Sequence, residues 1–140
     1  MTLTATALAL LGLVAWTLLL VFLLVNQRGM LVLSGKMAVN TFNPDGSNTP
    51  SAFGQRLVRA HANCLENLPL QAALLLYAIA TAQTAITEPL ALVLLGARVF
   101  QSSMHLLSTG PLFVWLRFAG LFAQLAILAW WLLLFAGLVG

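Results

Sequence analysis

The residues best suited to chemistry in this sequence are polar side chains that recur along otherwise apolar stretches. Arg59, Asn63 and Glu66 are spaced at i, i+4 and i+7. At about 100° per residue these three positions share one face of a helix. Arg56 lies one turn earlier, near the same face, and Tyr77 falls on it further along. Polar groups are costly within a lipid-facing segment, so a stripe of them indicates a functional face.

The same helical spacing occurs twice more, once before and once after a Ser-Thr-Gly-Pro turn at residues 108–111. Each set again places its polar groups on a single helix face. The two sets are Arg98, Gln101, Ser102 and His105 before the turn, and Arg117 and Gln124 after it.

The charges on these faces are unequal and predict an anionic ligand. Arg59, Arg98 and Arg117 are matched only by Glu66, and Arg56 raises the surplus from two positive charges to three. Buried charges need partners. A carboxylate fits the guanidinium fork well, so we expect a ligand that carries carboxylates.

Each of these residues also has a simpler interpretation. Glu66 with one arginine would form a structural ion pair, and Arg56 and Arg117 near helix ends would anchor to lipid headgroups. His105 would be a polar cap at a helix end, and Cys64, which is off the stripe, a packed thiol.

The composition indicates what must position these residues. Of the 140 residues 61% are hydrophobic and only 6% are charged, which is typical of a membrane protein. The length predicts one domain over residues 1–140. A net charge of +3 is too small for a nucleic-acid-binding patch. The single cysteine excludes an intrachain disulfide and a paired-cysteine metal motif, so no metal site is expected.

We predict an all-α integral membrane fold, a bundle of four transmembrane helices. The first run, residues 2–25, is uncharged and longer than a signal-peptide core. We expect Thr49 and Pro50 to begin the second span, and Thr87, Glu88 and Pro89 to begin the third. The first, third and fourth expected spans are residues 2–25, 87–107 and 112–138, and the second starts near Pro50 or Phe53 and ends near Gln83. The long connection at 26–49 contains an Asn-Pro-Asp-Gly turn.

Basic residues predict the orientation. Arg28 and Lys36 lie in the long connection, and Arg56 and Arg59 flank its far end, whereas the connection between the second and third spans carries only Glu88. The positive-inside rule then places the long connection in the cytoplasm and both termini outside. With this topology the three polar groups meet at one depth, open to the cytoplasmic side.

Four segments resemble a known family. Residues 59–69, Arg-Ala-His-Ala-Asn-Cys-Leu-Glu-Asn-Leu-Pro, are similar to the second-helix signature of the MAPEG family, the membrane-associated proteins of eicosanoid and glutathione metabolism. Residues 40–46 resemble the first loop of its prokaryotic members, residues 97–99 its third-helix motif, and residues 111–117 the start of its fourth helix.

The resemblance implies a four-helix subunit, assembled as a homotrimer in a bacterial inner membrane. It implies glutathione as co-substrate, bound between subunits near the cytoplasmic side. The implied reaction is transfer of the glutathione thiol to a lipophilic electrophile, or isomerase or peroxidase chemistry with the same thiol. Membrane lipid is the other expected partner.

By position, Arg59, Asn63 and Glu66 resemble the glutathione-binding residues of the family's second helix, and Arg98 resembles its third-helix arginine. Arg117 resembles the arginine that activates the thiol in the leukotriene C4 synthase branch, which makes it the expected catalytic residue.

Arg56, Gln101 and His105 complete the expected glutathione-binding set. Gln101 stands where family enzymes often have His or Tyr, and His105 where a tyrosine is common. Ala62 replaces an arginine of the prostaglandin E synthase branch. These departures leave the catalytic branch open.

Two other functions compete with a glutathione transferase. The first is a non-enzymatic lipid-binding scaffold, like the five-lipoxygenase-activating protein of the same family. The second is a small multidrug-type antiporter with Glu66 as its proton-coupled carboxylate. The arginines that outnumber Glu66 make the antiporter the weaker alternative.

Overall fold

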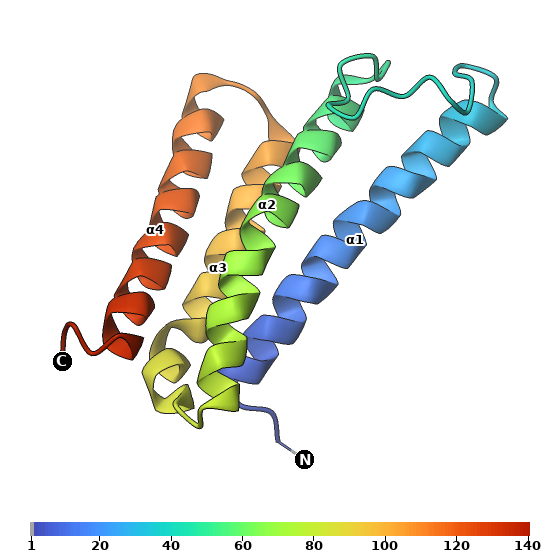
Figure 1. Ribbon diagram of the computed structural model, residues 1–140. Coiled ribbons are helices and arrows are strands. Elements are labelled where there is room, and N and C mark those ends of the chain that lie inside the picture. Colours follow the sequence, from blue (N-terminus) through green and yellow to red (C-terminus); the bar gives the residue numbers. More distant parts are fainter. Residues whose placement is uncertain (1) are drawn as a thin grey trace.

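The computed structural model describes residues 2–140, which form four helices and no strand (Figure 1). The helices are α1 (Ala5–Leu33), α2 (Ala52–Ala80), α3 (Thr84–Leu107) and α4 (Pro111–Phe135). The all-α expectation is confirmed. Helices α1, α3 and α4 are long and apolar enough to cross a membrane. Helix α2 is as long as α1, but the charged and amide side chains of its first half reduce its mean hydropathy.

Helix α1 extends further than its apolar run. It continues through Asn26 and Arg28 to Leu33, so the expected end near Val25 is wrong. The Asn26 side chain donates from Nδ2 to the carbonyl oxygen of Phe22 at 2.8 Å. A polar residue that bonds within its own helix need not end it, and the long connection therefore begins only at residue 34.

Helix α2 begins at Ala52, later than a cap at Thr49 would place its first residue. Ser51 is the N-cap, and its Oγ accepts from the backbone N–H of Gly54 at 3.0 Å. Thr49 instead accepts at its carbonyl oxygen from Gln55 Nε2 at 2.9 Å, so the expected cap at Thr49 is wrong. The helix continues through Pro69, which a helix with packed neighbours tolerates.

The start of α3 also differs from expectation. The helix begins at Thr84, so Thr87 lies inside it and is not its cap. Thr87 Oγ1 contacts Thr6 Oγ1 at 2.6 Å, and Glu88 accepts from the backbone N–H groups of Ala5 and Thr6 at 3.0 and 2.8 Å. The Glu88 carboxylate thus caps the N-terminus of α1 across the bundle.

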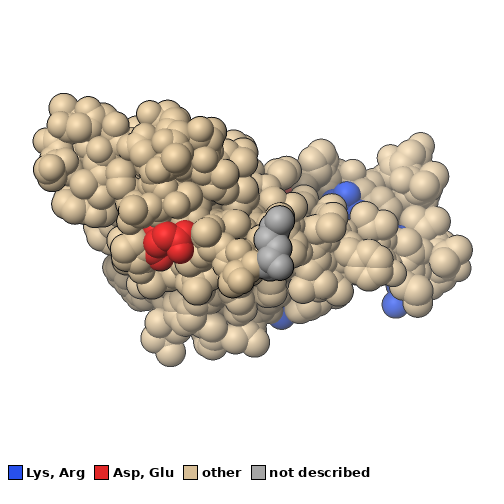
Figure 2. Space-filling view, turned by 90° about the horizontal axis from the view of Figure 1, so that it is seen from below, with Lys and Arg blue, Asp and Glu red and all other residues tan. Residues whose placement is uncertain are grey.

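Helix α3 occupies the middle of the bundle, in contact with α1, α2 and α4. The 34–51 and 108–110 connections lie at one end, and both termini lie at the other with the α2–α3 turn (Figure 1). Seen from the terminal end, the surface carries few charged atoms (Figure 2). This arrangement brings the first half of α2, the end of α3 and the start of α4 to one end of the molecule.

Two apolar clusters fill the bundle. The cluster toward the termini centres on Leu13, Leu75, Leu94 and Trp131. The cluster toward the long connection contains Leu20, Leu24, Leu57, Val58 and Cys64. Beside them lies a group of buried polar side chains, namely Gln71, Arg98, Gln101, Ser102 and Gln124.

Candidate functional site

Arg59, Asn63 and Glu66 lie on successive turns of α2. Arg59 and Glu66 are exposed, whereas Asn63 is half-buried between them. The shared face expected from the spacing places a cation and an anion at the surface, on either side of an amide. In the described part of the chain neither Arg59 nor Glu66 pairs with an opposite charge.

Asn63 joins this face to the interior. Its Oδ1 accepts from Arg98 NH1 at 2.6 Å and from Gln101 Nε2 at 3.0 Å. The Nδ2 group at the other end of the amide donates to no acceptor among residues 2–140. Asn63 therefore keeps two N–H donors available on the helix face that also carries Arg59 and Glu66.

Arg98 is a buried cation without a carboxylate partner among residues 2–140. The side chain is 1% exposed, and its Nε and second terminal nitrogen have no hydrogen-bond acceptor there. Its one other polar contact within the described residues is from NH1 to the sulfur of Cys64 at 3.8 Å. A guanidinium in this state creates a positive potential that attracts an anion to the adjacent surface.

Cys64 lies within this interior group. Its Sγ is 3.0 Å from Ser102 Oγ, and the residue is 1% exposed. The expectation of a packed thiol agrees with this environment.

Gln101 continues the polar contacts deeper into the bundle. Its Oε1 accepts from Gln124 Nε2 at 2.8 Å, and Gln124 Oε1 accepts from Gln71 Nε2 at 2.8 Å. Gln71 is absent from the residues that the sequence pattern singled out, although an amide inside an apolar segment should have a partner. These three glutamines, with Asn63 and Arg98, form one hydrogen-bonded chain across α2, α3 and α4, which we call the amide chain.

Arg117 and His105 form a separate pair at the α3–α4 end of the site. Arg117 NH1 is 3.0 Å from His105 Nδ1. A guanidinium can only donate, so Nδ1 is the acceptor and the imidazole is neutral in this pair. Arg117 is therefore held toward α3.

Arg56 lies apart from the Asn63 group. Its Nε donates to the carbonyl oxygen of Leu106 at 2.9 Å, and its guanidinium lies 5.9 Å from the centre of the Phe53 ring. Arg56 thus satisfies one of the free carbonyls at the end of α3. The structure gives it a helix-joining contact, which leaves its expected ligand contact a prediction.

A pocket of about 230 Å³ lies beside Arg59. Its far wall is the turn at residues 44–47, where Gly46 N–H donates to the carbonyl oxygen of Asn43 at 3.0 Å. Gly46 has a φ of 74°, and an added Cβ would lie 2.9 Å from Val58, so only glycine lets the turn approach α2 this closely. The expected Asn-Pro-Asp-Gly turn is thus confirmed, and it supplies a wall of the candidate site.

Asp45 stabilises that turn. Hydrogen bonds from the backbone and side chain of Ser47 hold the pKa of Asp45 below its ordinary value, and the Arg59 charge acts in the same direction. The carboxylate is fully exposed, so its negative charge reaches the pocket mouth through solvent.

An apolar groove separates α2 from α4 in the half of the bundle toward the termini. It has a volume of about 270 Å³ and is lined by leucines and alanines only, among them Leu70, Leu125 and Leu128. Lipid tails or a lipophilic small molecule suit such a lining.

A comparison with protein-family models matches residues 6–137 to the MAPEG family. Neither the curated proteins nor the solved structures yielded a match. The family match spans nearly the whole chain, in agreement with the membrane-compatible helices. The chain therefore belongs to the MAPEG family and is an integral membrane protein.

Proposed function

We propose that the protein is a glutathione-dependent membrane transferase. The observation that carries this proposal is the placement of Asn63. Its oxygen is fixed by Arg98 and Gln101, its amide N–H groups have no partner among residues 2–140, and it shares a helix face with exposed Arg59 and Glu66. Glutathione has two carboxylates, one ammonium group and peptide groups. A cation, amide donors and a carboxylate in a row are complementary to those groups.

Each ligand contact follows from the chemistry of its residue. Arg59 pairs with a carboxylate of glutathione, Glu66 with its ammonium group, and Asn63 donates to its backbone. Arg98 supports the site from within through its bond to Asn63 and through its unbalanced charge. Gln101 orients Asn63 by the same oxygen, and His105 orients Arg117.

The reaction we propose begins with transfer of the thiol proton to water, with Arg117 stabilising the thiolate. The sulfur then forms a bond to an electrophilic carbon, and the bond from that carbon to its leaving group breaks with its electron pair. The lipophilic part of the electrophile would lie against apolar surface, of which the α2–α4 groove is an example.

The exposure of Arg59 and Glu66 supports an assembled site. A subunit that leaves these charges at its surface and carries three membrane-compatible helices is suited to packing against further copies. We propose a homotrimer in which all four helices span the membrane and a neighbouring subunit closes the site, with the long connection in the cytoplasm.

Binding and turnover measured together test the proposal. The unfolding temperature of the purified protein is measured without ligand, with glutathione, and with S-methylglutathione, which cannot form a thiolate. Glutathione at one hundred times its Kd should stabilise the fold by about 2.7 kcal/mol. Turnover is followed with an activated aryl halide. Arg59→Gln and Glu66→Gln should weaken binding, whereas Lys36→Gln, in the long connection, should not.

The alternatives give different results. A scaffold would bind lipid but show neither glutathione stabilisation nor conjugation. An antiporter would show proton-coupled uptake that requires Glu66 and is indifferent to glutathione. Either result would exclude the proposed transferase.

A further inference from the structure

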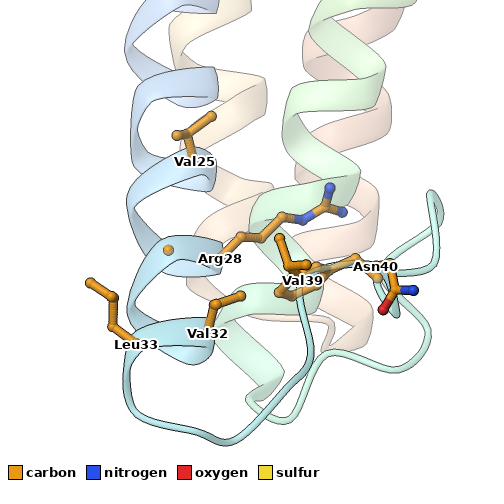
Figure 3. Close-up of a pocket in the computed structure, with 8 residues that line it drawn as sticks. Val25, Arg28, Val32, Leu33, Val39 and Asn40 are labelled. Atoms are coloured by element: carbon orange, nitrogen blue, oxygen red, sulfur yellow. The ribbon is translucent and has the colours of Figure 1, made fainter.

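A second pocket lies away from the candidate site, where the last turns of α1 face the start of the long connection (Figure 3). Its volume is about 600 Å³. Val25, Gly29 and Val32 form one wall, and Val39 and Phe42 form the other. Arg28 is the only charged residue among those that line it, and its side chain extends past Val39 in Figure 3.

Arg28 is incompletely satisfied in this pocket. Its Nε is buried and has no acceptor among residues 2–140, and its one hydrogen bond, to the carbonyl oxygen of Asn43, is long at 3.4 Å. Its guanidinium carbon lies 5.1 Å from the centre of the Phe42 ring, which fixes the side chain against the loop wall. A cation held in place, with an unpartnered donor and no carboxylate among the residues that line its pocket, favours an anion.

The depth of Arg28 identifies the kind of anion. From Ala5 to Val25 helix α1 is apolar and about 30 Å long, which equals the hydrocarbon thickness of a bilayer. Arg28 lies about one turn beyond that apolar segment. This is the level at which the phosphate groups of lipids lie.

An apolar track leads from the pocket toward the membrane centre. Val25, Phe22 and Leu18 follow one another along one face of α1, and each is 63% exposed. Residues at these spacings form a continuous stripe on a helix. An acyl chain that extends from a headgroup at Arg28 would cover it.

We propose that this pocket binds one anionic phospholipid, with its phosphodiester on Arg28 and an acyl chain along Val25, Phe22 and Leu18. The guanidinium donates to the phosphate oxygens, Val25 contacts the upper chain, and Val32, one turn further from the membrane centre, borders the headgroup. A zwitterionic lipid already carries an ammonium group beside its phosphate, so it gains less binding free energy from the Arg28 guanidinium. This site is independent of glutathione binding.

Native mass spectrometry with added lipid tests the proposal. The detergent-solubilised protein is titrated with phosphatidylglycerol or with phosphatidylcholine of identical acyl chains. We expect one phosphatidylglycerol per subunit to be retained, with a preference over phosphatidylcholine. Arg28→Gln should lower phosphatidylglycerol affinity roughly tenfold and remove the preference. Lys36→Gln, which removes a cation of the adjoining long connection outside the pocket, should change neither.

A second variant tests the shape of the pocket without altering charge. Gly29 has open space around its position, so Gly29→Phe should fill the pocket and reduce lipid retention. Gly96→Phe on α3, another position with open space, is the matched control and should retain lipid.

Three results would overturn the proposal. The first is equal retention of both lipids by the parent protein. The second is displacement of phosphatidylglycerol by inorganic phosphate alone, which would indicate a simple anion site. The third is a changed oligomeric state in both Arg28→Gln and Gly29→Phe, which would show that a second copy of the chain occupies the pocket.

Discussion

Asn63 Oδ1 lies 2.6 Å from Arg98 NH1, and this hydrogen bond joins a half-buried amide of α2 to a fully buried cation of α3. The same oxygen also accepts from Gln101, so the amide cannot rotate without breaking two bonds. The orientation of Asn63 toward a ligand is therefore determined by residues that no ligand needs to touch.

Asn63 thus accepts hydrogen bonds from Arg98 and Gln101 and is proposed to donate to the ligand. The first prediction separates these two roles. Asn63→Ala should destabilise the protein by about 1.5–3 kcal/mol, because Arg98 and Gln101 both lose their acceptor. Asn63→Asp retains the acceptor oxygen and adds a counter-charge for Arg98, so it should fold stably. It loses the N–H donors, however, and should bind glutathione more weakly.

Thermal unfolding with and without glutathione measures both effects. Asn67→Ala is the matched control, since Asn67 Nδ2 bonds only to the carbonyl oxygen of Asn63 in its own helix. Unchanged glutathione affinity in Asn63→Asp would remove Asn63 from the ligand contacts.

The second prediction concerns the amide chain. Gln124→Leu should lower the free energy of unfolding by about 0.5–2 kcal/mol, because it leaves Gln71 Nε2 and Gln101 Oε1 without partners. The double variant Gln71→Leu with Gln124→Leu removes both members of one bond. Its destabilisation should therefore be smaller than the sum of the two single variants. Additive losses in denaturant unfolding would mean that the glutamines act independently.

The sequence predicted the fold class and the meeting of polar groups better than it predicted helix ends. Periodicity reports which residues share a face, and this placed Asn63 correctly for contact with Arg98 and Gln101. Periodicity does not report which residues a side chain contacts on other helices. The hydrogen-bond partners of Asn63 lie on α3, and the spacing of residues on α2 does not identify them.

The errors at helix ends have a common physical cause. Loss of hydrophobicity was taken as the end of α1, but the backbone of a helix remains satisfied as it enters the headgroup region, and α1 continues to Leu33. Glu88 was expected to favour the start of its own helix, but it caps α1. A contact between residues more than eighty positions apart leaves no periodic signal.

The third prediction tests that contact. Glu88→Ala should lower the unfolding temperature more than Glu88→Gln, because glutamine keeps one oxygen that can accept from the backbone of Ala5 or Thr6. Hydrogen exchange should become faster at the first turn of α1 and remain unchanged at the start of α4. Equal unfolding temperatures for the parent and Glu88→Ala would contradict the capping role.

The fourth prediction concerns topology. Residues 34–51 and 108–110 lie at the same end of the bundle, and Arg28, Lys36, Arg56 and Arg59 gather toward that end, so it should face the cytoplasm. In a Cys64→Ala background, Ser47→Cys should resist a membrane-impermeant maleimide added outside intact cells. Gly140→Cys should react with it. Labelling of Ser47→Cys from outside would reverse the orientation.

The fifth prediction assigns the chemistry to Arg117. An ordinary thiol has a pKa of about 8.5, and a neighbouring guanidinium shielded from water lowers a thiol pKa by about 1–3. Arg117 is held by His105 rather than free to reach the headgroups, so its charge has a defined position. The thiol pKa of bound glutathione should therefore be well below that of free glutathione. It should rise in Arg117→Ala, and rise partly in His105→Phe, which removes the acceptor that orients the guanidinium.

The ultraviolet absorbance of the thiolate, followed against pH with bound glutathione, measures this pKa directly. Turnover at neutral pH should fall in both variants, since less thiolate is present, while glutathione affinity changes less because Arg59, Asn63 and Glu66 are intact. Lys36→Gln controls for the loss of a cation elsewhere. An unshifted thiol in the parent protein, or the same thiol pKa and turnover in Arg117→Ala, would show that Arg117 joins α4 to α3 and does not activate the thiol.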